Sequence, residues 1–145
     1  MPSEHFLIFG AFDRVSGHAI INAIKEHAVE NYIVDWYEHY FKNRISSLKL
    51  QSSCKTKLIS DGCPQGGCLS ILAWNLVFDK LLQKLKKLKV TIVRFADDAA
   101  LVATGTHPGP IILRLNQALK LTKAWAEEQS LELSKEKTCA ILFTR

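Results

Sequence analysis

Residues 94–101 read Arg-Phe-Ala-Asp-Asp-Ala-Ala-Leu, with the adjacent aspartates Asp97 and Asp98 between the apolar runs 90–95 and 99–103. Short apolar runs on both sides of a polar pair predict two strands joined by a tight turn. Aspartate is common in such turns because it tolerates turn conformations. Alternatively, the turn presents two carboxylates to a divalent ion such as Mg²⁺, which prefers hard oxygen ligands.

Residues 61–70, Asp-Gly-Cys-Pro-Gln-Gly-Gly-Cys-Leu-Ser, form a second distinctive stretch. Pro64 fixes one turn of the chain, while Gly66 and Gly67 allow a backbone or a ligand to come close. Gln65 can donate and accept hydrogen bonds, and the N-terminus of a following helix would favour phosphate. The alternative is a tight loop before a helix, with Gln65 merely exposed.

The hydrophobic pattern of the remaining chain predicts alternating helices and strands. We expect a strand over 5–9, a helix capped by Ser16, a helix around 33–41 and a hairpin over 45–59. Helices over 69–87 and 111–129 and a strand over 138–143 complete the prediction. The mixture predicts an α+β fold in which helices pack on one face of an antiparallel sheet.

Two sets of side chains on these helices allow both a structural and a functional interpretation. The aromatic set at helical spacing is more typical of a core than of a stacking surface for bases. The lysine set is more typical of a solvated helix face than of a contact with a nucleic-acid backbone. The aromatic set is Trp36, Tyr37, Tyr40 and Phe41, and the lysine set is Lys80, Lys84 and Lys87.

The 145 residues are enough for about one domain, and the net charge of +5 only slightly favours a polyanionic partner. No apolar run reaches the roughly 20 residues of a membrane span, and the N-terminus is a poor signal peptide, so we expect an intracellular protein of cytoplasm or nucleus. The four cysteines form no Cys-x-x-Cys pair and are expected to be free thiols rather than zinc ligands.

Four motifs occur in order along the chain: Gly-Ala-Phe-Asp at 10–13, Pro-Gln-Gly-Gly-x-Leu-Ser at 64–70, Phe-Ala-Asp-Asp at 95–98 and Leu-x-Leu-Ser-Lys-Glu-Lys-Thr at 131–138. Together they resemble the palm of reverse transcriptases, most closely that of non-LTR retrotransposons. The resemblance extends from about His5 to Arg145. It implies a polymerase palm whose catalytic Asp-Asp pair lies on a β-hairpin.

The resemblance also implies roles for individual residues. Asp97 matches the main metal ligand and Asp98 a supporting one, with Mg²⁺ or Mn²⁺ as the cofactor of two-metal phosphoryl transfer. Lys137 matches a position that could protonate leaving pyrophosphate or pair with phosphate, although it could also be an ordinary surface lysine. Phe95 stands where the family usually has tyrosine, so the hydroxyl is lost while the ring could still pack.

Nucleotide and template contacts are implied for the other two motifs. Gln65, Gly66 and Gly67 match positions that line the incoming nucleotide and the template–primer. Phe12 matches the bulky residue beneath the sugar, which can exclude a 2′-hydroxyl. The implied partners are an RNA template, a DNA primer and deoxynucleoside triphosphates.

One departure from the family pattern concerns its first motif, Asp-x-x-x-Ala-Phe-Asp. Its first aspartate is the other main metal ligand, and the position six residues before Asp13 is Leu7. No aspartate occurs before Asp13 in this chain. The metal site is therefore expected to be incomplete, and the chain is expected to be inactive or nearly so as a polymerase.

The chain is expected to form a single partial reverse transcriptase domain over 1–145, namely a palm with fingers and thumb missing. Two alternatives stay open. The chain could be a nucleic-acid-binding or interaction module that kept the scaffold without catalysis. It could also fail to form a stable protein, since missing neighbours would leave apolar faces exposed.

Overall fold

The computed structural model describes residues 2–9, 11–64 and 66–143, with side chains described from residue 11 onward. The chain divides into two compact units, one of residues 1–11 and 78–145 and the other of residues 12–77. The two units share one long helix, α4 (Cys68–Lys86).

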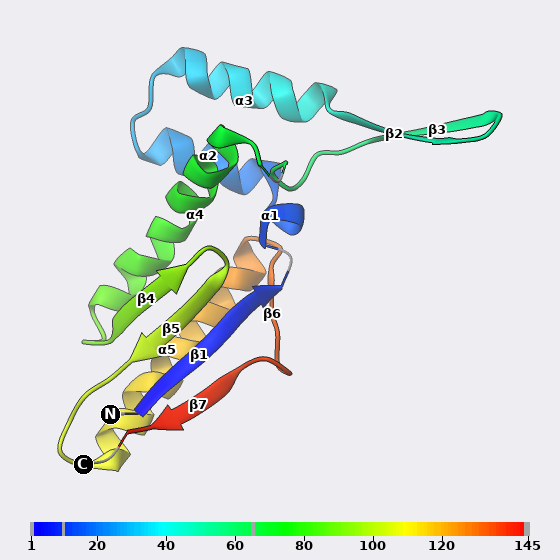
Figure 1. Cartoon of the computed structure of the whole chain (residues 1–145). Helices are drawn as coiled ribbons and strands as arrows, with labels where there is room; N and C mark the ends of the chain where they lie inside the picture. Colours follow the sequence, from blue (N-terminus) through cyan, green and yellow to red (C-terminus); the bar gives the residue numbers. More distant parts are fainter. Residues whose placement is uncertain (1, 10, 65, 144–145) are drawn as a thin grey trace. The chain divides into compact units, whose positions relative to one another are not determined.

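The first unit is built on an antiparallel sheet with the N-terminal strand at its centre (Figure 1). Strand β1 (Pro2–Phe9) pairs on one side with β5 (Asp98–Val102), which in turn pairs with β4 (Thr91–Phe95). On its other side β1 pairs with β6 (Glu132–Leu133) and with β7 (Cys139–Leu142). Two separate segments therefore follow one another along the same edge of β1.

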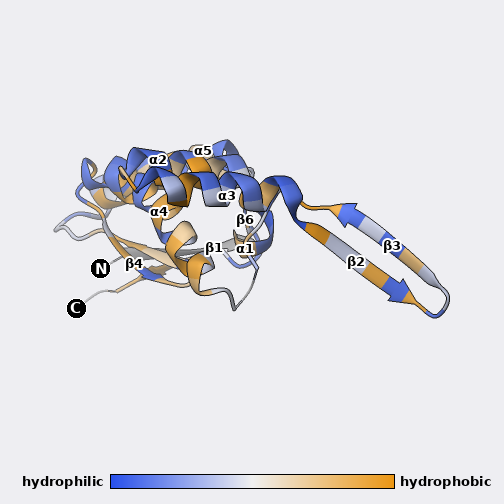
Figure 2. Ribbon diagram, turned by 90° about the horizontal axis from the view of Figure 1, so that it is seen from above, coloured by the Kyte–Doolittle hydropathy of each residue, from blue (hydrophilic) through white to orange (hydrophobic). Residues whose placement is uncertain are grey.

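Helix α5 (Pro108–Glu128) covers one face of this sheet (Figures 1 and 2). The C-terminal part of α4 packs against it through Phe78, whose ring meets Trp125 edge to face at 5.5 Å between centroids. Phe78, Trp125 and Leu101 of β5 are fully buried. The predicted fold class, an antiparallel sheet with helices on one face, is confirmed.

The second unit contains α1 (Ala11–Arg14), α2 (Gly17–Glu26), α3 (Asn31–Asn43) and the hairpin of β2 (Ile45–Leu50) and β3 (Ser53–Leu58). The predicted cap of α2 is confirmed, because the Ser16 hydroxyl accepts a hydrogen bond from the Ala19 amide at 3.1 Å. Ile20, Ala23 and Ile24 form the buried stripe of α2.

The structure corrects the interpretation of the aromatic set on α3. Tyr37 and Phe41 are buried, but Trp36 is 48% exposed and Tyr40 is half-buried. The aromatic residues of this helix span a wider stripe than its neighbours cover, so its outer flank remains in solvent.

The other differences from the predicted elements are small. Helix α5 begins at Pro108 rather than Ile111, because proline fits the first turn of a helix. Strand β6 was not predicted, since two residues carry no periodic signal. In the described part of the chain, no helix is long and apolar enough to cross a membrane.

Candidate active site

The Asp97–Asp98 pair lies at the tip of the β4–β5 hairpin, as predicted. Phe95 pairs with Asp98, so Ala96 and Asp97 alone form the connection. Ala96 adopts a φ of 53°, a left-handed conformation that is unfavourable for residues with a side chain. Asp97 is half-buried and Asp98 is exposed as the first residue of β5. Both carboxylates are thus held at the end of a strand that belongs to the central sheet.

The ring of Phe95 does not pack as expected. It is 83% exposed, although it directly precedes the turn. Alternate residues of β4 face opposite sides of the sheet, and α5 covers only one of them. Phe95 therefore lies on the uncovered side.

The backbone register places position 7 beside the aspartate pair. Leu7 is the last residue of β1 paired with β5, and its partner is Asp98. Position 7, identified in the sequence only by counting back from Asp13, is therefore directly across the ladder from the hairpin tip. The residue at this position is leucine.

Lys137 lies in the turn between β6 and β7. The turn is closed by Ser134, whose carbonyl accepts hydrogen bonds from the Thr138 amide at 3.1 Å and the Thr138 hydroxyl at 2.6 Å. Because His5 pairs with Cys139 and Ile8 with Leu133, this turn is opposite residues 6 and 7 of β1. The topology thus brings Asp98, position 7 and the turn of Lys137 into one band across the sheet, with the Lys137 side chain exposed.

The 61–70 loop and α1 form a connected structure in the second unit. The Gly62 amide donates to the Val15 carbonyl at 2.7 Å, and the Cys63 amide donates to the Phe12 carbonyl. A Cβ at Gly62 would lie 2.5 Å from the Asp13 carbonyl oxygen, so this position requires glycine. The half-buried Phe12 ring lies 5.9 Å from that of Trp74, which fixes Phe12 next to the start of α4.

Gly66 and Gly67 have different surroundings. Gly66 has a φ of 84° and open space where a Cβ would lie, which leaves its backbone accessible to a ligand. A Cβ at Gly67 would lie 2.8 Å from the hydroxyl oxygen of Ser70, which donates to the Pro64 carbonyl at 2.8 Å. Gly67 therefore permits the turn itself, and Gln65 lies outside the described residues.

These motifs and this palm-like sheet agree with the comparison against protein families. A family model described as reverse transcriptase (RNA-dependent DNA polymerase) matches residues 6–143. The chain belongs to the reverse transcriptase family. The predicted resemblance is thereby confirmed.

Relatives of this reverse transcriptase domain come from retrotransposons of insects. A Retrovirus-related Pol polyprotein from type-1 retrotransposable element R1 2 of Nasonia vitripennis is 32% identical over 82 residues, which cover 57% of this chain and 20% of the relative. A putative 115 kDa protein in type-1 retrotransposable element R1DM of Drosophila melanogaster is 25% identical over 134 residues, which cover 92% of this chain and 13% of that protein. The chain is of the non-LTR retrotransposon type and spans a fifth or less of the length of these two relatives.

Solved structures agree on the fold. Apo telomerase from Candida tropicalis, truncated from its C-terminal domain, superposes with a TM-score of 0.75 at 14% identity, covering 97% of this chain and 30% of that one. Telomerase from Candida albicans in complex with a fragment of telomeric RNA gives a TM-score of 0.59 at 15% identity, covering 99% of this chain and 27% of that one.

Asp97 and Asp98 are the carboxylates that the reverse transcriptase domain presents at the tip of its β4–β5 hairpin. Reverse transcriptases generally use divalent ions, which take carboxylate oxygens as ligands. In the described part of the domain, no three histidine, cysteine, aspartate or glutamate residues gather closely enough to hold a metal. Asp97 and Asp98 are adjacent, but the position across the ladder from Asp98 is Leu7. These residues do not fit a site for two ions.

Sequence reasoning missed Arg44, which anchors the 61–70 loop of the domain. Its guanidinium donates to the Gly62 carbonyl at 2.6 Å and to the Asp61 carbonyl at 2.8 Å. A single arginine after a helix carries no motif signal, so only the tertiary structure identifies it. The thiol of Cys63 beside these carbonyls is buried, and burial raises its pKa to about 11.

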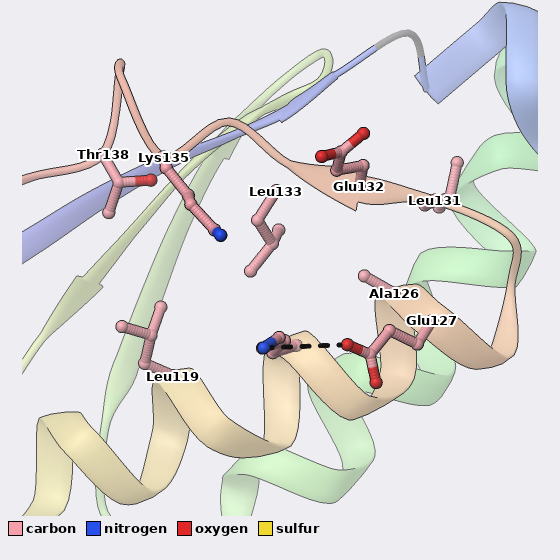
Figure 3. Close-up of a pocket in the computed structure, with 9 residues that line it drawn as sticks. Leu119, Ala126, Glu127, Leu131, Glu132, Leu133, Lys135 and Thr138 are labelled. Carbon is pink, nitrogen blue, oxygen red and sulfur yellow. Dashed lines mark ion pairs between the residues drawn. The ribbon is translucent and has the colours of Figure 1, made fainter.

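The domain also contains a cavity of about 490 Å³ (Figure 3). It is formed between α5 and the segment 131–138, with Leu119, Ala126 and Leu133 among its apolar walls. At its margin Lys123 and Glu127 form an ion pair at 3.8 Å. This exposed pair contributes little to stability, and the cavity lining does not include the aspartates.

Proposed function

We propose that this domain descends from an enzyme that synthesises DNA on an RNA template, and that this copy is inactive or nearly so. The substrates of the active ancestor would be an RNA template, a DNA primer and deoxynucleoside triphosphates. Membership of the reverse transcriptase family and the Asp97–Asp98 tip support the first part. The second part rests on one observation, the pairing of Leu7 with Asp98.

The proposed roles follow the sites described above. Asp97 would be the main carboxylate toward Mg²⁺ or Mn²⁺, and Asp98 would support it. Lys137 would contact phosphate or donate a proton to pyrophosphate. Phe12 beneath the sugar, together with Gln65, Gly66 and Gly67, would line the nucleotide and the template–primer.

The consequence of Leu7 can be expressed as a rate. Phosphoryl transfer depends on positioning and on neutralising charge, and an apolar side chain in place of a ligand contributes to neither. Every 1.36 kcal/mol lost from transition-state stabilisation lowers the rate about tenfold. We therefore expect a loss of about a thousandfold or more relative to a complete site.

A second function is a nucleic-acid-binding module without catalysis. Leu7 is compatible with it, and a fully exposed hairpin with basic side chains in the second unit specifically favours it. It predicts salt-dependent binding of nucleic acid by a chain that incorporates no nucleotides.

The test compares the natural chain with Leu7→Asp, Leu7→Asn and Asp97→Ala, after thermal melting has verified that each variant is folded. Mn²⁺ binding is titrated by electron paramagnetic resonance, and primer extension is measured with oligo(dT) on poly(rA). Leu7→Asp should bind Mn²⁺ at least about tenfold more tightly, because it adds a carboxylate opposite Asp98. Leu7→Asn matches its size without its charge and should not.

Two results would contradict the proposal. Primer extension by the natural chain that disappears in Asp97→Ala would show that another group replaces the missing ligand. Unchanged Mn²⁺ affinity in a folded Leu7→Asp variant would show that position 7 does not belong to the metal site.

A further inference from the structure

The exposed flank of α3 carries a column of two aromatic rings and a cation. Trp36 and Tyr40 stack with 5.4 Å between ring centroids and 9° between planes. The guanidinium of Arg44, at the C-terminal cap of α3, lies over the Tyr40 ring at 5.6 Å. Trp36, Tyr40 and Arg44 form what we call the stacking ridge.

Hollows flank the stacking ridge on two sides within the second unit. One, of about 360 Å³, is lined by Trp36, His39, Tyr40, Asn43 and Arg44. The other, of about 270 Å³, is lined by the same two rings together with Tyr37, Phe41 and residues of the 63–70 loop. Both rings of the stacking ridge therefore border open hollows.

The β2–β3 hairpin continues directly from the stacking ridge at Arg44 (Figure 1). Every residue of its two strands is exposed. Residues 44–58, which we call the basic hairpin, include four cations and no acidic side chain, namely Arg44, Lys49, Lys55 and Lys57. A two-stranded hairpin without further support is only marginally stable in water, so contact with a partner would stabilise it.

The register of the basic hairpin mixes cationic and aliphatic side chains on one face. Lys55 pairs with Leu48 and Lys57 with Ser46, and paired residues of antiparallel strands share a face. Figure 2 shows hydrophilic and hydrophobic positions mixed along both strands. If a second copy of this chain bound to this face through the same surface, the cations of the two copies would repel each other, which is unfavourable.

We propose that the stacking ridge and the basic hairpin bind a single strand of nucleic acid. A base would stack on the exposed ring of Trp36 at the end of the column, and the phosphates would lie along Lys55 and Lys57. Stacked aromatics beside a positive track are the combination by which proteins hold single strands without reading sequence. None of these residues is among those proposed for catalysis, so the proposed binding does not require that the domain catalyses polymerisation.

Intrinsic fluorescence provides a direct reporter of the ridge. Of the three tryptophans, Trp74 and Trp125 are at most 1% exposed, whereas Trp36 is 48% exposed. Oligo(dT) and oligo(U) 12-mers should quench the fluorescence of the chain by stacking on Trp36. Trp36→Phe should abolish the quenching while keeping most of the affinity.

Affinity is measured by anisotropy of the same oligonucleotides carrying fluorescein. Trp36→Ala should weaken binding about tenfold, since one base loses its stacking partner. Leu113→Ala is the control, because Leu113 is 60% exposed on α5 and belongs to the first unit; it should not change affinity. Asp97→Ala should also bind normally, which separates this proposal from the proposed catalytic ancestry.

Salt titrations test the hairpin. Lys55→Gln/Lys57→Gln removes two cations and should reduce the slope of log K against log salt by about 1.4. Lys86→Gln/Lys87→Gln removes two exposed cations at the end of α4 and should leave the slope unchanged. The proposal is overturned by absence of binding at low salt, by equal losses in test and control variants, or by binding of an acidic peptide in preference to either oligonucleotide.

Discussion

The β4–β5 and β2–β3 hairpins are both closed by two residues, and each places a residue other than glycine at positive φ, Ala96 at 53° and Gln51 at 48°. Their surroundings differ. Strand β5 pairs with β1 and buries Ala99, Ala100 and Leu101, whereas β2 and β3 pair only with each other and bury nothing. The same local construction therefore gives a fixed presentation of aspartates in one place and a fully exposed hairpin in the other.

The largest expected difference concerns side-chain truncation in the two hairpins. Leu101→Ala should lower the free energy of unfolding by about 2–5 kcal/mol, because Leu101 is fully buried and its loss leaves a cavity. Leu48→Ala should change it by less than about 0.5 kcal/mol, since Leu48 is 61% exposed. Urea denaturation measures both, and equal losses would show that the β2–β3 hairpin is covered in solution.

A second difference concerns thiol chemistry. Cys54 on β3 is exposed, while Cys63 is buried and has a pKa of about 11. Because the thiolate is the reactive form, Cys63 should react with a thiol reagent at pH 8 at least about a hundredfold more slowly than Cys54. Its rate should rise with pH toward its pKa.

Mass spectrometry of partly labelled chains assigns each modification. All four cysteines lie in the described part of the chain and are free, as expected from the sequence. If Cys63 were labelled as fast as Cys54, the 61–64 loop would have to open frequently enough to expose the thiol, despite its anchoring by Arg44.

The smallest expected effect concerns the two turns. Ala96→Gly should raise the free energy of unfolding by up to about 1 kcal/mol, because glycine adopts positive φ without steric cost. Gln51→Gly is the matched change in the exposed hairpin and should alter global unfolding by less than about 0.5 kcal/mol. Thermal and urea unfolding of both variants measure these changes. An equal gain in the free energy of unfolding would contradict the conclusion that the β4–β5 hairpin is held by the sheet and the β2–β3 hairpin is not.

Much of the fold followed from local patterns. The four longer helices, both hairpins and the Asp97–Asp98 turn were predicted because periodicity and turn residues are properties of neighbouring positions, whereas the four-residue helix α1 was not predicted. The exposure of Trp36 was not, since helical spacing identifies an apolar flank and not what covers it. Arg44 was missed because its hydrogen-bond partners, the carbonyls of Asp61 and Gly62, belong to a distant loop.

The sequence by itself determined the family and the departure from it. Four ordered motifs carry the family signal, and a leucine at position 7 is a fact of side-chain identity. Only the tertiary structure decided that position 7 pairs with Asp98 and that Trp36, Tyr40 and Arg44 form a column, with Trp36 exposed, beside a basic hairpin. Both depend on hydrogen bonding and burial between segments far apart in the chain, which local spacing does not encode.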